Sequence, residues 1–262
     1  MKTALFASTL ALTAGLAAAQ QPTFLVTNGS TLYRTTVGGP VETFNLGDDI
    51  VGMAVAADGT IYATSSTANA TSGLFELYTI DDAEGTPTLS LVTDQLASVY
   101  TALSIIDGSL YSSFEGGQFL VNVDLNTFAE TTVGATGVFN VGGAAYDQGS
   151  DTLYWSSGID DALYTIDYTT AAATLVGSLG IDVAQQGMDF YEFNGVLYHA
   201  VDNETTGRFE LGTTDTTTGA YTFLKTIVDA NLQGSTSLAV IPTPASAAVL
   251  GLGGLLATRR RR

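Results

Sequence analysis

The chain has 262 residues, with 26 acidic and 8 basic side chains and a formal net charge of −18 at pH 7. Its hydrophobic content of 45% is enough to build a packed core, which excludes a disordered chain. The absence of cysteine excludes disulfides and thiolate metal sites, and the acidity argues against nucleic acid as a partner, because phosphates are bound by Lys and Arg.

The charges are unevenly distributed along the chain. The interior carries all 26 acids but only three bases, Arg34, Arg208 and Lys225, for a net charge of −23. The other bases, Lys2 and residues 259–262, flank two apolar ends. The sequence therefore describes a strongly acidic body between two apolar segments.

The N-terminal segment has the three parts of an export signal. Lys2 precedes an apolar run from Ala4 to Ala18, and small residues follow at Ala17 and Ala19. A positive start, an apolar stretch and an Ala-x-Ala site are typical of a secretory signal peptide. We expect residues 1–19 to be a signal peptide that is cleaved after Ala19; the alternative is a buried first helix.

One sequence phrase recurs along the body, and each copy predicts a β-hairpin. It comprises an apolar strand, an Asx-Gly type of turn, and a second strand containing Leu-Tyr or Ile-Tyr. The turns are Asp58-Gly59, Asp107-Gly108 and Asn194-Gly195, with a longer version at 147–151. Asx-Gly between apolar runs is a strong hairpin signal.

A second phrase follows each hairpin and completes a unit of four strands. It is a strand that ends near Asp, a turn, and a Thr-rich strand, as in Leu163–Asp167 followed by Ala173–Val176. Successive units are 50, 41, 44 and 50 residues apart, counted between Met53, Leu103, Ala144, Met188 and Leu238. That period is typical of a four-stranded propeller blade.

The two ends of the body complement each other. Ser237–Val240 predicts the first strand of a fifth unit, and its other strands are expected at Thr23–Thr27, Thr31–Thr36 and Val41–Leu46. The sequence thus predicts an all-β, five-bladed β-propeller over residues 20–241, whose last blade is shared between the N- and C-terminal segments. The architectural alternative is a β-sandwich or a solenoid.

The body resembles the bacterial extracytoplasmic propellers that are built on Leu-Tyr-x-Ile-Asp-x-x-Thr-Gly-x-x-Thr repeats. Leu163–Asp167 and Thr218–Thr222 carry that likeness. The resemblance is one of architecture and implies no single activity.

The C-terminal segment, residues 242–262, resembles the PEP-CTERM sorting signal of bacteria that carry an exosortase. It has Pro242 and Pro244, an apolar run over 245–257, and a basic end formed by Arg259, Arg260, Arg261 and Arg262. The family usually has Glu between the prolines, where this chain has Thr243. The resemblance implies a transmembrane sorting helix in the inner membrane that an exosortase-type protease cuts near the prolines. The alternative is a simple tail anchor.

His199 is the only histidine, so a multi-histidine zinc site is impossible. A Ser-His-Asp arrangement could draw on Asp202 and on Ser112 or Ser113. His199 follows a Leu-Tyr strand pattern, and we therefore expect it to be a structural residue of a blade strand.

Acidic side chains suggest two other chemistries. Asp147, Asp189 and Glu192 are candidates for the paired carboxylates of a glycosidase, although no spacing shows that they converge. The cluster Asp81, Asp82 and Glu84 offers the oxygen ligands that calcium prefers, with ordinary solvated loops as the alternative. Asp81, Asp124 and Asp167 recur at strand ends, which is typical of turn residues that bind nearby backbone N–H groups.

These observations predict an exported protein, anchored in the inner membrane as a precursor and then placed in the cell envelope or on the extracellular surface. We expect a monomeric, non-catalytic binding or structural protein without a cofactor, with a calcium ion at the acidic cluster of Asp81, Asp82 and Glu84 as the alternative. Its expected partners are the sorting protease and an envelope or extracellular ligand such as a polysaccharide. The alternative is a carbohydrate-active enzyme, a glycosidase or lyase, that uses carboxylates on one propeller face.

Overall fold

The computed structural model describes residues 21–114, 118–232 and 234–242. The predicted signal peptide with Ala17 and Ala19, and the tail with Pro244 and Arg259–Arg262, lie outside the described residues. No helix in the described part of the chain is long and apolar enough to cross a membrane.

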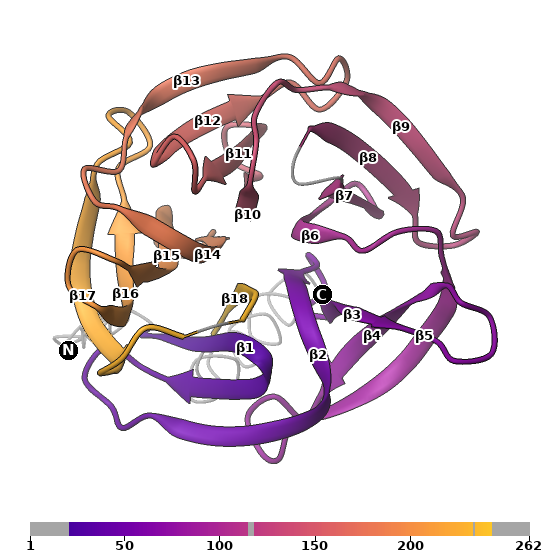
Figure 1. Ribbon diagram of the computed structural model, residues 1–262, viewed down its shortest axis with the longest axis horizontal. Coiled ribbons are helices and arrows are strands. Elements are labelled where there is room, and N and C mark those ends of the chain that lie inside the picture. Colours follow the sequence, from indigo (N-terminus) through magenta and orange to yellow (C-terminus); the bar gives the residue numbers. More distant parts are fainter. Residues whose placement is uncertain (1–20, 115–117, 233, 243–262) are drawn as a thin grey trace, which may run out of the picture.

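The regular secondary structure of the described residues is entirely β (Figure 1). Its sheets surround a central axis, which confirms the predicted all-β propeller arrangement. The strands are β1 (Pro22–Thr35), β2 (Glu42–Val55), β3 (Ile61–Ala68), β4 (Phe75–Asp81), β5 (Thr88–Leu96), β6 (Thr101–Ile106), β7 (Ser109–Phe114), β8 (Phe119–Asp124), β9 (Glu130–Ala135), β10 (Val141–Asp147), β11 (Thr152–Ser157), β12 (Ala162–Ile166), β13 (Ala173–Ser178), β14 (Val183–Tyr191), β15 (Val196–Asn203), β16 (Arg208–Thr214), β17 (Tyr221–Val228) and β18 (Thr236–Pro242).

Hydrogen bonds divide the described strands into four sheets. Three are four-stranded meanders, β6–β9, β10–β13 and β14–β17, and the fourth has six strands in the order β18-β1-β2-β3-β4-β5. β2, β6, β10, β14 and β18 line the axis, and each contacts the next around the ring (Figure 1).

The first two strands are longer than the sequence predicts. We expected three short strands, but the first two are joined as β1 and the third runs on to Val55 as β2. β1 leaves β18 for β2 near Gly29, and β2 leaves β1 for β3 near Gly47. Both glycines have positive φ, 59° and 83°, which a residue without a Cβ adopts readily, so each strand changes partner without a loop.

The predicted pairing of the two ends is present. β1 and β18 pair antiparallel from Pro22 opposite Pro242 to Asn28 opposite Thr236. Phe24 and Leu238, on the paired segments, are almost completely buried. The pairing gives β1 and β18 a partner each, which protects edges that would otherwise template aggregation.

The repeat residues that set the predicted period meet at the axis. Met53, Leu103, Ala144, Met188 and Leu238 all line its middle, and their packing leaves no room for a water molecule. The inner strands approach so closely that a Cβ on Gly187 would lie 2.6 Å from the backbone nitrogen of Leu238. The remaining core lies between neighbouring sheets, for example around Trp155 between the β6–β9 and β10–β13 sheets.

Candidate functional site

The inner strands begin around a hollow at one end of the axis, which we call the mouth. It has a volume of about 480 Å³. The end of the molecule where β18 finishes, opposite to the mouth, is called the far end. The residues that line the mouth are Val51, Ser98, Val99, Thr101, Phe114, Asn140, Val141, Gly142, Gln185, Ser235 and Thr236.

The mouth lining contains no charged side chain among its described residues. Ser98, Asn140, Gln185 and Ser235 come from four different connections between units or from the strand start that follows one. Within the described part of the chain, none of these four side chains makes a hydrogen bond to protein. The sequence does not predict this site, because each unit contributes a single residue to it and these residues share no pattern.

Acidic residues surround the mouth at the same end, on connections between strands and on the part of β2 that precedes Ile50. Asp48 and Asp49 precede the inner part of β2, and Asp182 precedes β14. Asp160 and Asp161 lie between β11 and β12, where Asp161 accepts the Val183 N–H at 3.0 Å. The rim of the mouth is therefore negative while its lining is neutral.

The structure does not assemble the candidate Ser-His-Asp arrangement. Ser112 and Ser113 are on β7, and their hydroxyls contact Thr101. His199 is on β15 in a different sheet. Asp202 is on β15 as well, but an odd number of positions away, so it points to the opposite face of the strand.

His199 is a neutral core residue. It is fully buried, and its Nε2 is 3.1 Å from the Gln186 Oε1, which can only accept. Nε2 therefore carries the proton, and Nδ1 accepts from the Thr214 hydroxyl at 3.0 Å. Burial lowers the pKa of His199 to about 3, so it does not exchange protons near neutral pH.

The three glycosidase candidates lie toward the far end, where they bind backbone. Asp147 accepts the Gly149 N–H, and Glu192 accepts the Gln148 N–H at 2.6 Å, so Glu192 reaches the turn that begins at Asp147. Asp189 accepts N–H groups from Phe190 and from Val240 of the neighbouring β18. Burial, with a smaller contribution from the Glu192 charge, raises the pKa of Asp189 to about 7.

The candidate calcium residues are part of a turn that binds an arginine. Asp81 accepts the hydroxyls of Thr79 and Ser90, and Asp82 accepts the Thr86 N–H. Glu84 is exposed. No group of three or more acidic or histidine side chains in the described ranges is arranged to hold a metal ion.

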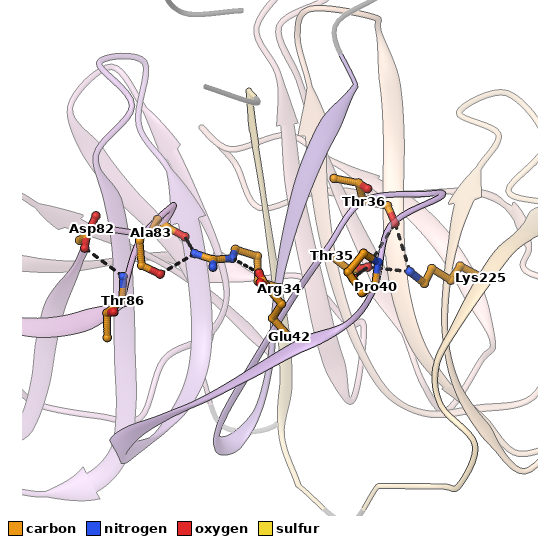
Figure 2. A network of polar contacts seen from close by, with 10 residues as sticks. Arg34, Thr35, Thr36, Pro40, Glu42, Asp82, Ala83, Thr86 and Lys225 are labelled. Carbon is orange, nitrogen blue, oxygen red and sulfur yellow. Dashed lines mark hydrogen bonds and ion pairs between the residues drawn. The ribbon is translucent and has the colours of Figure 1, made fainter. Parts of the chain in front are cut away.

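Arg34 provides the positive charge for this turn (Figure 2). Its Nη1 donates to the carbonyls of Ala83 and Gly85, at 2.9 and 2.8 Å, and its Nε pairs with Glu42 at 2.8 Å. The guanidinium also lies 4.6 Å from the centre of the Phe44 ring. Arg34 thus ties β1 to the turn between β4 and β5.

Lys225 holds the other side of the same hairpin (Figure 2). Its ammonium donates to the Thr35 hydroxyl at 2.7 Å and to the carbonyls of Thr36 and Gly39. Partial burial lowers the pKa of Lys225. Arg34 therefore connects the β1–β2 hairpin to the β4–β5 turn, and Lys225 connects it to β17. The sequence did not predict either role.

No protein-family model matches the chain, and no curated protein matches it. Its fold is similar to a chain in the "Crystal structure of Nidogen/Laminin Complex", with a TM-score of 0.55 and 13% identity over 83% of this chain and 98% of that one. It is also similar to the "Crystal structure of TolB from Acinetobacter baumannii", with a TM-score of 0.50 and 16% identity over 79% of this chain and 53% of that one. At such identities the likeness concerns the fold alone.

Proposed function

We propose that the protein is an exported, non-catalytic binding or structural protein of the cell envelope or extracellular matrix. The observation that carries the proposal is the mouth, a hollow of about 480 Å³ with four neutral polar side chains that make no hydrogen bond among the described residues. Ligand sites are typically concave, of about 300–1,000 Å³, with apolar walls and a few convergent polar groups. The mouth has this size and carries polar side chains from several units, and its lining is more polar than that of a typical site.

The body is proposed to have five blades, with the six-stranded sheet divided between two of them. Residues 46–49 of β2 are the boundary, because Asn45 still pairs with β1 while Ile50 pairs with Gly29 and with Ser65 of β3. Hydrogen–deuterium exchange tests the division. The amides of 46–49 should exchange faster than those of 51–55, and uninterrupted protection along β2 would favour four units.

The chain ends are proposed to be a cleaved signal peptide and an exosortase-sorted tail. β18 begins at the mouth with Thr236 and ends at Pro242, roughly 20 Å away for its length. A tail that leaves from Pro242 would hold the far end toward the inner membrane and present the mouth outward. The intact mass of the native protein tests both ends, since a mass that includes Met1 or Arg262 contradicts the corresponding cleavage.

The full chain incubated with a panel of polysaccharides tests the function itself. We expect saturable co-sedimentation with at least one polysaccharide or envelope fraction, and no new reducing or unsaturated ends. Release of such ends by the wild-type chain would contradict a non-catalytic role.

A carbohydrate-active enzyme is the second candidate, favoured by one observation. Asp189, with its pKa of about 7, could act as a general acid, and the charge of Glu192 contributes to that pKa. For such an enzyme, Asp189→Asn and Glu192→Gln should each abolish turnover of the polysaccharide, while Asp147→Asn on the adjacent turn should reduce turnover less.

A further inference from the structure

The side chains at the mouth combine two kinds of surface. Asn140 and Gln185 each present an amide, which both donates and accepts, and Ser98 and Ser235 present hydroxyls. Val51, Val99 and Phe114 supply apolar wall between them. Beside the mouth, Phe139 leaves 46% of its surface exposed on the connection that precedes Asn140.

This combination suits a molecule that carries many hydroxyl groups on an apolar frame. Sugar hydroxyls both donate and accept, so they can pair with the NH₂ group and with the carbonyl oxygen of a side-chain amide. An anionic group only accepts and can pair with the NH₂ group alone. The C–H face of a sugar ring buries well against apolar and aromatic surface. The floor of the mouth is closed by the axial packing, which limits entry to the end or a side branch of a longer chain.

The charges around the mouth select against anions. Asp160, Asp161, Asp182 and Glu204 lie on connections at this end, and Asp48 and Asp49 lie in β2 just before its inner part. Among the described residues, Arg208 is the basic side chain at this end, and its Nε is paired with Asp229 at 2.7 Å. Fields of one sign around a cleft repel ligands of that sign over about one Debye length, roughly 8 Å at physiological salt.

We propose that the mouth binds a neutral saccharide unit, with Asn140 and Gln185 as its main hydrogen-bonding residues and the acidic rim excluding uronate-bearing and other anionic polymers. The inference rests on the proposed binding function and names the ligand class and the site. It also predicts that the affinity for the saccharide depends only weakly on salt, because a neutral ligand forms no ion pair with the uncharged lining of the mouth.

The test uses the full chain and calorimetric titration with cello-, malto-, xylo-, manno- and laminari-oligosaccharides. Oligogalacturonates and glucosamine oligomers serve as the anionic and cationic comparisons. The mouth pair Asn140→Asp with Gln185→Glu keeps side-chain shape but replaces two amide donors by carboxylates. The matched far-end pair, Asn126→Asp with Gln148→Glu, makes the same changes on exposed turns.

We expect saturable binding of at least one neutral oligosaccharide, weakened at least tenfold by the mouth pair and unchanged by the far-end pair. If the mouth pair does not fold, Gln185→Ala alone should weaken binding at least threefold. Binding that is unchanged in all mouth variants would overturn the site while leaving the binding function standing. Absence of binding to every neutral probe, or tighter binding of galacturonates or glucosamine oligomers, would overturn the ligand class.

Discussion

Several carboxylates at the far end bind other groups of the protein, whereas the side chains of Ser98, Asn140, Gln185 and Ser235 at the mouth make no hydrogen bond within the described residues. At the far end, Asp124, Asp167 and Asp215 each accept two N–H groups of the turn that they begin. Asp151 accepts the hydroxyls of both Tyr146 and Tyr168. At the mouth, the side-chain amides of Asn140 and Gln185 accept and donate no hydrogen bond in the part of the chain that the structure describes.

This difference separates residues that stabilise the fold from residues that can recognise a ligand. A carboxylate that begins a turn is stabilised by the hydrogen bonds that it accepts. The hydroxyl of Thr169 and backbone N–H groups lower the pKa of Asp167 to about 2, and the hydroxyl of Thr217 and backbone N–H groups do the same for Asp215. A free amide gains nothing from the fold. The far end therefore explains stability and the mouth explains the proposed binding, and each can be perturbed separately.

Of the changes considered, removal of the N-terminal strands should destabilise the protein most. Deletion of residues 20–47 takes away β1 and the first part of β2, so β18 loses its pairing partner and the rest of β2 loses its pairing with β1 at Ile50. We expect loss of cooperative thermal unfolding and aggregation, because unpaired strand edges associate. Deletion of residues 2–19 is the control and should leave the melting curve unchanged. A truncated body that melted at the wild-type temperature would contradict the shared blade.

Crowding the axis should have the next largest effect. Gly187→Ala places a Cβ 2.6 Å from the backbone of Leu238 on the closing strand, so one inner strand must move. Such overpacking should lower the free energy of unfolding by about 2–3 kcal/mol. Gly38→Ala, on a far-end turn with nothing within 4 Å, is the matched control. Equal denaturant midpoints for the two variants would show that the axis is not closed by this packing.

The sequence predicted the parts of the fold that are local. Asp107-Gly108 is a two-residue hairpin turn in which both φ angles are positive, 49° and 77°, as Asx-Gly allows. The pairing of Thr23–Thr27 with Ser237–Val240 followed from two incomplete units at the ends. The expected turn role also holds for Asp124 and Asp167, but Asp81 binds hydroxyl groups instead.

Features that depend on several units could not be predicted. Ser98, Asn140, Gln185 and Ser235 are far apart in sequence, and only ring closure brings them to one mouth. The continuity of β1 and β2 depends on which neighbours Gly29 and Gly47 face after closure, which no local pattern encodes. The contacts that Arg34 and Lys225 make across units could not be predicted for the same reason, since they end mostly on backbone carbonyls that no residue pattern marks.

Loss of the lysine contact at the far end should have a moderate effect. Lys225→Met keeps an apolar stem but removes an ammonium that donates to three oxygens around the Thr36 turn. We expect the free energy of unfolding to fall by about 1–2 kcal/mol, as for hydrogen bonds to a charged group. Arg208→Met, at an exposed ion pair of the mouth end, should cost less than about 0.5 kcal/mol. Urea titrations compare the two, and the reverse order would contradict the fastening role.

The pH dependence of stability should reveal two desolvated groups, the half-buried Asp189 and the buried His199, whose contributions change with pH in opposite directions. The folded pKa of Asp189 is raised to about 7, so its contribution is present at low pH and lost as pH rises toward 7. The folded pKa of His199 is lowered to about 3, so its contribution is present at neutral pH and lost as pH falls below about 6.5. The two slopes oppose each other between about pH 4.5 and 6.5.

Substitution of each residue should reveal the pH dependence of the free energy of unfolding that the other residue causes. Asp189→Asn should make the free energy of unfolding fall as pH drops from about 6.5 to 4.5, by at most about 1.4 kcal/mol per pH unit. His199→Gln should change the slope in the opposite direction. Burial also raises the pKa of Asp202, which acts in the same sense as Asp189 and remains in both variants. Identical slopes for wild type and both variants, measured by urea titration, would show that neither group is buried as described.

Added salt should have the smallest effect on the melting temperature. A comparison of different salts also tests whether calcium binds at the far end. A body charge of −23 repels itself, so screening by salt should raise the melting temperature by no more than about 2–4 °C for a domain of this size. At matched ionic strength we expect sodium, magnesium and calcium to act equally, because the turn at Asp82 already binds Arg34. A calcium site filled at 100 times its dissociation constant would add about 2.7 kcal/mol. A calcium-selective rise that the triple variant Asp81→Asn, Asp82→Asn, Glu84→Gln abolished would show that these carboxylates do hold an ion, despite the arginine beside them.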